Sequence, residues 1–242
     1  MQRSAALVLA CAIGIFAAGG TAISRDAVAT SSKRVDFAGE TVTGDARHIA
    51  DWAVHSGDHQ GLPFIIVDKV YARALAFDAS GRLIAVTPVL IGMAVGDTFA
   101  PGVANMDMHQ TLPSQRITPA GRFFAEEDRN LKGQRVLWVD YDAGIAIHKL
   151  PTKKTKQRRH ERMASPYPAD HRITYGCINV PSAFYEDVVG RQFRRKGGIV
   201  YVLPDKAPLQ AVFKSYDISS AVAQFPVEAN PSHVIPAAAR RF

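Results

Sequence analysis

The sequence is poor in cysteine, with only two in 242 residues. Two cysteines are too few for a disulfide-stapled scaffold or for a zinc site built from several cysteines. The chain also shows no internal repeat at a fixed period, and its 47% hydrophobic and 21% charged residues are ordinary globular composition. These features exclude a fully disordered chain, a collagen, a coiled coil and a membrane protein with several spans. The length allows one large domain or two small ones.

The longest apolar run lies at the N-terminus and is short. A basic start over residues 1–3 precedes an alanine-rich apolar stretch over residues 4–18, and small residues follow. About 15 apolar residues are fewer than the roughly 20 that span a bilayer, so the layout is that of a secretory signal peptide. Candidate cleavage patterns end at Ala22 and Ala29, and we assign residues 1–29 to the leader. An uncleaved N-terminal anchor is the alternative.

Cys177 is the single cysteine that remains once this leader, which contains Cys11, is removed. A lone thiol in an oxidising compartment cannot form an internal disulfide. It is buried and inert, reactive, or paired with another chain. The residues around it have to decide between these alternatives.

Positive charge is concentrated in one segment, residues 149–172, which carries eight Lys or Arg and two acidic residues. Its net charge of +6 equals that of the whole chain without residues 1–29. A nucleic-acid surface would need interleaved aromatic residues; the segment offers only Tyr167, and export argues against that partner. Two interpretations stay open: a solvated basic loop, or an electropositive wall beside a site for an anionic substrate.

Hydrophobic patterning predicts a mostly β domain. A helix is expected over residues 45–54 after a flexible polar lead-in, a second over residues 182–193 and a third over residues 209–216. Residues 149–172 show no clear periodicity. The strand-like runs are residues 64–67, 70–77, 83–91, 122–124, 136–141, 145–148, 175–180 and 199–203.

The residues with the strongest chemistry stand at the two ends of the basic segment. His148 ends one strand-like run, and Cys177 follows Gly176 in another. A thiolate is a strong nucleophile, and a neighbouring imidazole can take the thiol proton. A glycine before the cysteine allows close approach of the backbone to a substrate carbonyl, whose oxyanion the local N–H groups can bind. The alternative is that Cys177 is an ordinary buried apolar residue.

The sequence TYGCIN from Thr174 to Asn179, with Ile-His ending at His148 upstream, resembles the signature of the L,D-transpeptidases of bacterial cell walls. That family has Ile or Val followed by His, a spacer, and then Ser/Thr-His-Gly-Cys-x-Asn/Arg. The resemblance covers roughly residues 62–204. It is supported by DASG at residues 78–81, TPAG at residues 118–121 and GIVY at residues 198–201.

The resemblance implies a fold and a domain organisation. The expected fold is mostly β, an L,D-transpeptidase-like β-sandwich with a helix after the cysteine strand and a basic lid segment. The expected parts are a signal peptide (1–29), a lead-in with a short helix (30–61), the catalytic domain (62–204) and a C-terminal tail (205–242).

The resemblance also implies a reaction. Cys177 would attack the carbonyl of the third residue of a peptidoglycan tetrapeptide stem, release the terminal D-alanine and form a thioester. His148 would take the thiol proton and later activate the acceptor amine, either diaminopimelate of a second stem or a lysine of an envelope lipoprotein. Neither a metal nor a cofactor is implied. We expect an exported monomer in the periplasm or cell envelope, with no nucleic-acid partner.

Three departures from the family pattern bear on the site. Tyr175 replaces the usual histidine, and a tyrosine hydroxyl is not a base near neutral pH. Lys149 stands where glycine or serine is common, although the carbonyl that orients the imidazole is still available. The spacer between His148 and Cys177 is 29 positions, and its extra length is the basic segment.

Supporting roles follow from the same resemblance. Backbone N–H groups of Tyr175, Gly176 and Cys177 would hold the oxyanion. The cations Arg172, Lys153 and Lys154 are candidate contacts for stem carboxylates, with solvated surface as the alternative.

Two other functions remain open. A hydrolase, either an L,D-carboxypeptidase or an enzyme that cleaves cross-links, would use the same cysteine and histidine with water as acceptor. A non-catalytic peptidoglycan-binding module would keep Cys177 as a buried apolar residue.

Overall fold

The computed structural model describes residues 35–99, 110–151, 156–218 and 240–241. Within these ranges, no helix is both long enough and apolar enough to span a bilayer. The predicted signal peptide lies outside the described residues, as do Lys153 and Lys154.

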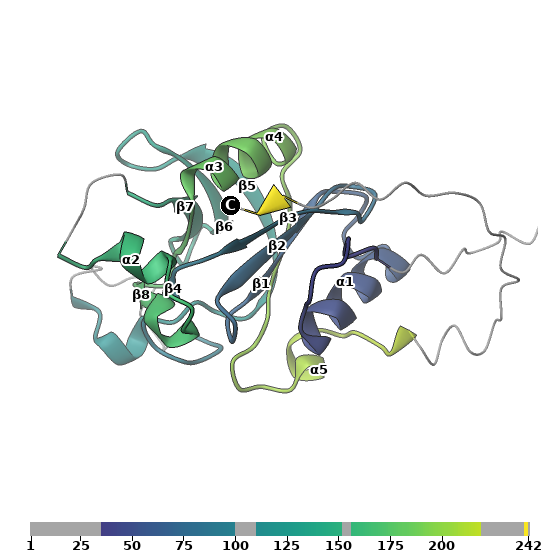
Figure 1. Cartoon of the computed structure of the whole chain (residues 1–242), viewed down its shortest axis with the longest axis horizontal. Helices are drawn as coiled ribbons and strands as arrows, with labels where there is room; N and C mark the ends of the chain where they lie inside the picture. The colour runs from purple at the N-terminus through teal and green to yellow at the C-terminus, as the bar shows by residue number, and fades with distance from the viewer. Residues whose placement is uncertain (1–34, 100–109, 152–155, 219–239, 242) are drawn as a thin grey trace, which may run out of the picture. The chain divides into compact units, whose positions relative to one another are not determined.

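The described part of the chain is mostly β, as predicted, with one large curved sheet and few helices (Figure 1). Nine strands form this mixed sheet in the order β11-β3-β2-β1-β10-β5-β6-β7-β9, and β4 pairs with β8 in a small second sheet. The strands are β1 (Phe64–Asp68), β2 (Arg73–Phe77), β3 (Leu83–Pro88), β4 (Ile91–Gly92), β5 (Gly121–Arg129), β6 (Arg135–Asp140), β7 (Ile145–Lys149), β8 (Arg172–Thr174), β9 (Ile178–Val180), β10 (Gly198–Val202) and β11 (Arg240–Arg241).

Strand β5 joins the two halves of the large sheet. Its residues 121–125 pair with β10, and its residues 126–129 pair with β6. The charged second half of β5, EEDR, was missed because acidic residues are depleted in strands. Because β5 is long, β6, β7 and β9 continue the sheet past β10. Strands β7 and β9, in this half of the sheet, carry the candidate catalytic residues.

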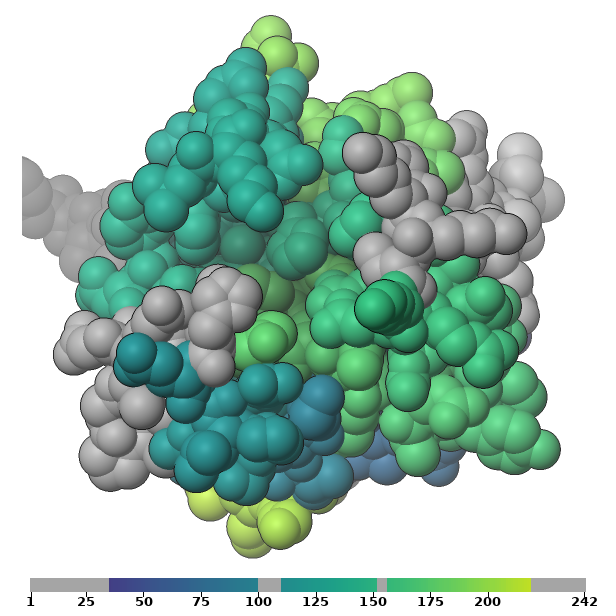
Figure 2. Space-filling model, turned by 90° about the vertical axis from the view of Figure 1, so that its left-hand side faces the viewer, coloured from purple at the N-terminus to yellow at the C-terminus, as the bar shows by residue number. Residues whose placement is uncertain are grey.

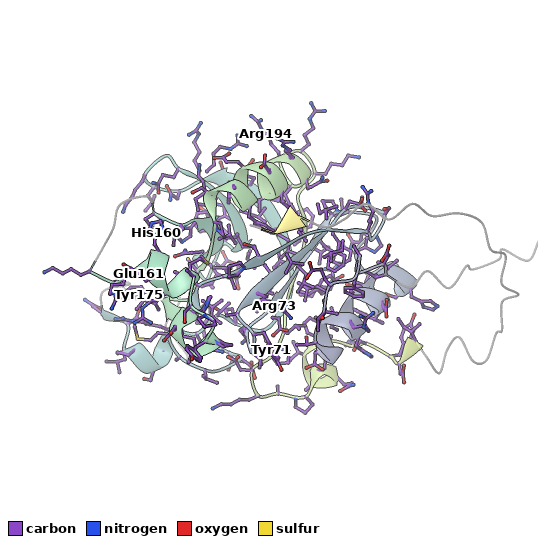
Figure 3. The ribbon with its side chains drawn as sticks, in the orientation of Figure 1. Tyr71, Arg73, His160, Glu161, Tyr175 and Arg194 are labelled. Atoms are coloured by element: carbon purple, nitrogen blue, oxygen red, sulfur yellow. The ribbon has the colours of Figure 1, made fainter. Side chains whose placement is uncertain are left out.

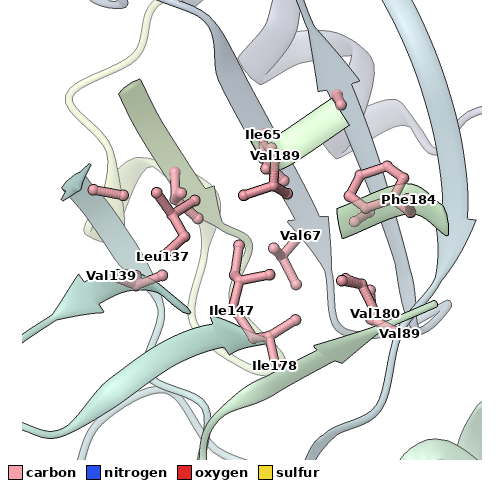
Figure 4. Close-up of a cluster of buried hydrophobic side chains, with 14 of the residues drawn as sticks. Ile65, Val67, Val89, Leu137, Val139, Ile147, Ile178, Val180, Phe184 and Val189 are labelled. Carbon is pink, nitrogen blue, oxygen red and sulfur yellow. The ribbon is translucent and has the colours of Figure 1, made fainter. Parts of the chain in front are cut away.

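Strand β1 is apolar over four successive positions because both of its faces are buried. Ile65 and Val67 belong to a core cluster that includes side chains of β6, β7 and β9 (Figure 4). Phe64 and Ile66 belong to a second cluster, on the other face, with helix α1.

Helix α1 (Gly44–Ser56) confirms the first predicted helix. Thr43 caps it, with Oγ1 accepting from the N–H of Ala46, and Gly57 ends it in a left-handed conformation. The expectation of a flexible lead-in is wrong for the described residues before the helix. Val35 and Phe37 are buried in the same cluster as the helix, because their apolar side chains cover the outer face of the sheet.

The C-terminal helix α5 covers only Leu209–Val212, which is shorter than the predicted helix over residues 209–216. Phe213 turns to an extended conformation there and buries its ring in the cluster under α1, against Tyr201. The burial of this ring therefore overrides the local helical pattern.

The predicted helix after the cysteine strand is present as a helical run of three parts: α3 (Ser182–Phe184), the π-helical turn η5 (Tyr185–Val189) and α4 (Gly190–Gln192). Phe184, Val188 and Val189 bury their side chains in the core cluster of Figure 4. This packing holds the helical run after β9 against the sheet.

The basic segment contains a short helix, α2 (Arg159–Met163), and a 3₁₀ turn, η4 (Pro168–His171). Met163 packs with Leu90, Leu150 and Ile173 in a small apolar cluster. The buried His171 ring lies within hydrogen-bond distance of the carbonyl oxygens of Val89 and Ser165, at 2.9 and 3.0 Å. The described part of the segment is therefore docked on the sheet edge.

Candidate active site

Strand pairing places the candidate catalytic side chains on one face of the sheet. Strands β7 and β9 are parallel, and His148 pairs with Asn179 while Ile147 pairs with Ile178. Ile147 and Ile178 point into the core. Since successive side chains of a strand point to opposite faces, His148 and Asn179 lie on the other face, together with Cys177, two positions before Asn179.

The predicted strand over residues 175–180 is present only as β9 (Ile178–Val180), because a bend at Tyr175–Gly176 separates β8 from β9. Gly176 has φ of +133°, and a Cβ there would lie 2.7 Å from the carbonyl oxygen of Ile117. Thr118 Oγ1 donates to the Gly176 carbonyl at 2.7 Å. The glycine is therefore required by close backbone approach, and the turn aims Cys177 away from the core.

The Cys177 side chain is half-buried, and its Sγ lies 3.4 Å from the carbonyl oxygen of Gly144. Burial raises the pKa of the Cys177 thiol above its ordinary range. The backbone N–H of Ala146 and the positive charge of Arg159 only partly offset this effect. The resting sulfur is therefore a thiol that donates to Gly144.

His148 is held by two neighbours. Its Nδ1 lies 3.2 Å from the carbonyl oxygen of Lys149, which is the orienting contact predicted for that carbonyl. Asn179 Nδ2 lies 2.9 Å from Nε2 and 3.2 Å from Nδ1. Burial lowers the pKa of His148, the Lys149 carbonyl opposes that shift, and the charge of Arg159 lowers the pKa further. The imidazole is therefore neutral and can accept a proton.

Arg159, at the start of α2, also reaches this site, and sequence reasoning missed it. Its Nη1 donates to Asn179 Oδ1 at 2.5 Å, and its Nε donates to Gln157 Oε1 at 2.7 Å. Within the basic segment nothing distinguishes Arg159 from Arg158 by pattern. Only the folding of α2 against the sheet edge separates the half-buried residue from its exposed neighbour.

Figure 2 presents the side of the molecule on which α2 lies. This face is hollowed near its centre, between the teal strands β5 to β7 and the green segment that holds α2. His160 and Glu161 of α2 lie on the same side of the molecule as Tyr175, whereas Arg194 lies beyond α4 (Figure 3). Among the described residues, no group of three or more His, Cys, Asp or Glu side chains could hold a metal ion.

Solved L,D-transpeptidase structures are similar to this chain. One from Xylanimonas cellulosilytica is 14% identical with a TM-score of 0.38, and the match covers 58% of this chain and 60% of that one. The catalytic domain of an E. faecium L,D-transpeptidase is 18% identical with a TM-score of 0.34, over 58% of this chain and 95% of that one. An L,D-transpeptidase in complex with imipenem is 13% identical with a TM-score of 0.33, over 58% of each.

No protein-family model and no curated protein sequence matches the chain. The match spans about 60% of the first solved chain's length. The case for a function therefore rests on the residues of the site.

The other predicted residues occupy different surroundings. Arg172 forms an ion pair with Asp205 at 2.6 Å and donates to the carbonyl oxygens of Lys69 and Ala94. These contacts hold β8 to neighbouring loops, so its predicted contact with stem carboxylates stays a prediction.

Tyr175 lies under the guanidinium of Arg116, whose Cζ is 3.9 Å from the ring centroid. The Gly176 N–H donates to Thr174 Oγ1 at 3.2 Å, so this predicted oxyanion donor is engaged within the turn. Lys149 turns its Nζ to Glu186, 2.6 Å away, and serves the imidazole only through its carbonyl.

Proposed function

We propose that the protein is an L,D-transpeptidase acting on peptidoglycan tetrapeptide stems, with Cys177 as nucleophile and His148 as base. The supporting observation is the placement of His148, Asn179 and Cys177 on one face of the sheet edge, with the imidazole oriented by the Lys149 carbonyl. The same residues carry the sequence resemblance to that family.

In the proposed acylation, the Cys177 sulfur attacks the carbonyl carbon of the third stem residue while His148 takes the thiol proton. The tetrahedral intermediate then loses D-alanine, whose amine nitrogen receives that proton from His148, and a thioester remains. Both partners are neutral at rest, because burial raises the pKa of Cys177 and lowers that of His148. The proton therefore moves as the sulfur turns from Gly144 to attack.

The proposed oxyanion donors are the backbone N–H groups of Tyr175 and Cys177, since that of Gly176 is engaged with Thr174. In the second half-reaction, His148 takes a proton from the acceptor amine, the amine attacks the thioester, and Cys177 leaves with the proton returned. A diaminopimelate amine would give a 3→3 cross-link, and a lysine would attach an envelope protein.

The cations around the site suit an anionic stem. Arg116 and Arg159 are both half-buried next to Tyr175 or Asn179, close to the nucleophile. A fixed positive charge in a hollow raises the local concentration of an acidic peptide. The export that delivers the enzyme to such a substrate rests on the predicted signal peptide.

The test is covalent labelling with a carbapenem, followed by intact-protein mass spectrometry. The wild type is expected to gain the mass of one carbapenem, because ring opening by the thiol adds the whole molecule as a thioester. Cys177→Ala is expected to gain none, and His148→Gln to react at least 100-fold more slowly. A wild type without adduct, and without turnover of tetrapeptide muropeptides with or without an amine acceptor, overturns the proposal.

A further inference from the structure

Arg159 makes a contact that decides which end of the Asn179 side chain faces the base. Its guanidinium approaches from α2, and Nη1 lies 2.5 Å from Asn179 Oδ1. Asn179 is fully buried, so water cannot substitute for either partner. On the opposite side, the Asn179 amide faces the His148 ring.

The chemistry of the two groups fixes the orientation of the amide. A guanidinium carries only hydrogen-bond donors, so the group of Asn179 that faces it must be the carbonyl oxygen. The amide nitrogen then faces the His148 ring, 2.9 Å from Nε2 and 3.2 Å from Nδ1. A donor placed against the imidazole favours its neutral form, since the imidazolium has no lone pair to offer and repels a positive N–H dipole.

The second ring nitrogen completes the assignment. Because the Lys149 oxygen can only accept, the His148 nitrogen beside it, Nδ1, carries the hydrogen. The lone pair is thereby left on Nε2. The Asn179 amide nitrogen lies close to both ring nitrogens, across the ring, so it leaves this lone pair free to take the thiol proton. The hydrogen-bond network therefore describes one tautomer and one charge state of the base.

We propose that Arg159 is a positioning residue: it holds the Asn179 amide across the His148 ring and so keeps the imidazole neutral, while the Lys149 carbonyl sets its tautomer. The inference rests on the proposed function for its catalytic meaning, but not for its geometry. In this proposal, the basic segment places the guanidinium of Arg159 at the sheet edge, next to Asn179. The packing of Met163 and the 2.8 Å contact of His160 Nε2 with the Pro151 carbonyl hold α2 in place for this task.

The charges around the pair agree with this role. Arg159 lowers the pKa of both His148 and Cys177, so it favours a neutral base beside a more readily ionised thiol. Lys149 lies next to His148 in sequence, but its charge is paired with Glu186, away from the ring. The Arg116 guanidinium stacks on the Tyr175 ring.

The experiment needs no substrate, so its result is independent of the transpeptidase proposal. The full chain is titrated by ¹⁵N NMR of the His148 ring, and alkylation of Cys177 by iodoacetamide is timed as a function of pH. In Arg159→Met, the pKa of His148 is expected to rise, while the Nδ1–H tautomer, set by the Lys149 carbonyl, is kept. Alkylation at pH 7 is expected to slow about threefold to tenfold, as expected for loss of one nearby charge.

Two variants make the test specific. Arg158→Met removes the same charge from the exposed neighbour, whose pairing with Glu161 is long at 3.9 Å, and is expected to match the wild type in both readouts. Arg159→Lys restores a positive donor and is expected to recover most of the alkylation rate and most of the wild-type titration of His148. If Arg159→Met does not fold, Arg159→Gln takes its place with the same expected direction.

The proposal is overturned if a folded Arg159→Met protein keeps the wild-type titration of His148 and the wild-type alkylation profile. It is also overturned if Arg158→Met changes both as much, since net charge alone would then explain the effect. Failure of carbapenem labelling with an intact Arg159 effect would instead count against the transpeptidase function only.

Discussion

The hydroxyl of Thr118 donates to the carbonyl oxygen of Gly176 at 2.7 Å and so ties the loop before β5 to the turn that carries Cys177. The Oγ1 atom of Thr118 also accepts a hydrogen bond from the N–H of Gly92 at 2.8 Å. Thr118 itself is buried. One side chain therefore holds together the loop after β4, the loop before β5 and the nucleophile turn.

Thr118→Val is expected to lose both hydrogen bonds while keeping the shape of the side chain. Leaving the Gly92 N–H and the Gly176 carbonyl unpaired costs about 1–3 kcal/mol of unfolding free energy for each group, and the looser turn is expected to slow carbapenem acylation. Urea denaturation and adduct kinetics measure the two effects. Thr87→Val, at a buried threonine outside the site whose hydroxyl makes one long bond at 3.3 Å, is the control and should keep the acylation rate.

Gly176→Ala tests the backbone at the nucleophile directly. The left-handed φ of +133° and the 2.7 Å approach of a Cβ to the Ile117 carbonyl oxygen leave no room for a methyl group. We expect a loss of about 1–3 kcal/mol and at least a tenfold slower acylation, measured by denaturation and mass spectrometry. Gly133→Ala, in an open hairpin turn with the same sign of φ, should cost stability without changing the acylation rate.

The sequence predicted the β class, α1 and the helical run after β9, and its motif singled out His148 and Cys177 as candidate catalytic residues. These features rest on local apolar patterns and on a short motif. The extension of β5 and the docking of Val35 and Phe37 were missed, because burial against distant strands decided them. Local patterns carry no such information.

Within the site, the contrast between Arg172 and Arg159 explains the limit of sequence reasoning. Both are arginines of the basic segment, and charge alone favours either as a ligand contact. Arg172 became the partner of Asp205, and Arg159 became the partner of Asn179, through contacts across the fold. Position after folding, and not residue type, assigns the two roles.

Acylation is expected to tolerate acid better than an ordinary histidine base allows. Burial and the charge of Arg159 lower the pKa of His148, so the imidazole stays neutral to a lower pH than an unperturbed histidine. The carbapenem acylation rate of the wild type should therefore fall only below about pH 6.5, the ordinary histidine value. A mass-spectrometric pH series measures it, and an acidic limb above that value would contradict the assignment of His148 as base.

Tyr175 is expected to act through its ring and not through its hydroxyl. The Arg116 guanidinium stacks on the ring at 3.9 Å, an arrangement that phenylalanine can reproduce. Tyr175→Phe should keep acylation within about threefold. Tyr175→Ala should lose about 0.5–1 kcal/mol of stability and slow the reaction, because Arg116 is released. A large loss in the phenylalanine variant would assign a role to the hydroxyl instead.

Asp97 belongs to a network of buried charged side chains that connects to β8, the strand before the Cys177 turn. Lys69, fully buried, lies 3.0 Å from Asp97 and 3.4 Å from Asp205, which in turn pairs with Arg172 of β8. Burial would raise the pKa of Asp97. The N–H groups of Asp205, Ala207 and Lys206 and the ammonium of Lys69 outweigh it and lower the pKa to about 2.

A carboxylate with a folded pKa below its unfolded value stabilises the protein above the unfolded pKa, and this stabilisation is lost as pH falls through the folded pKa. Asp97 should therefore contribute about 2 kcal/mol that disappears as pH falls from about 4 to about 2. Asp97→Asn is expected to cost at least that much at pH 7 and to flatten the dependence of unfolding free energy on pH across this window. Urea denaturation at a series of pH values measures it, with Asp128→Asn on the surface as control. An equal pH slope in wild type and Asp97→Asn would show that the acid sensitivity arises elsewhere.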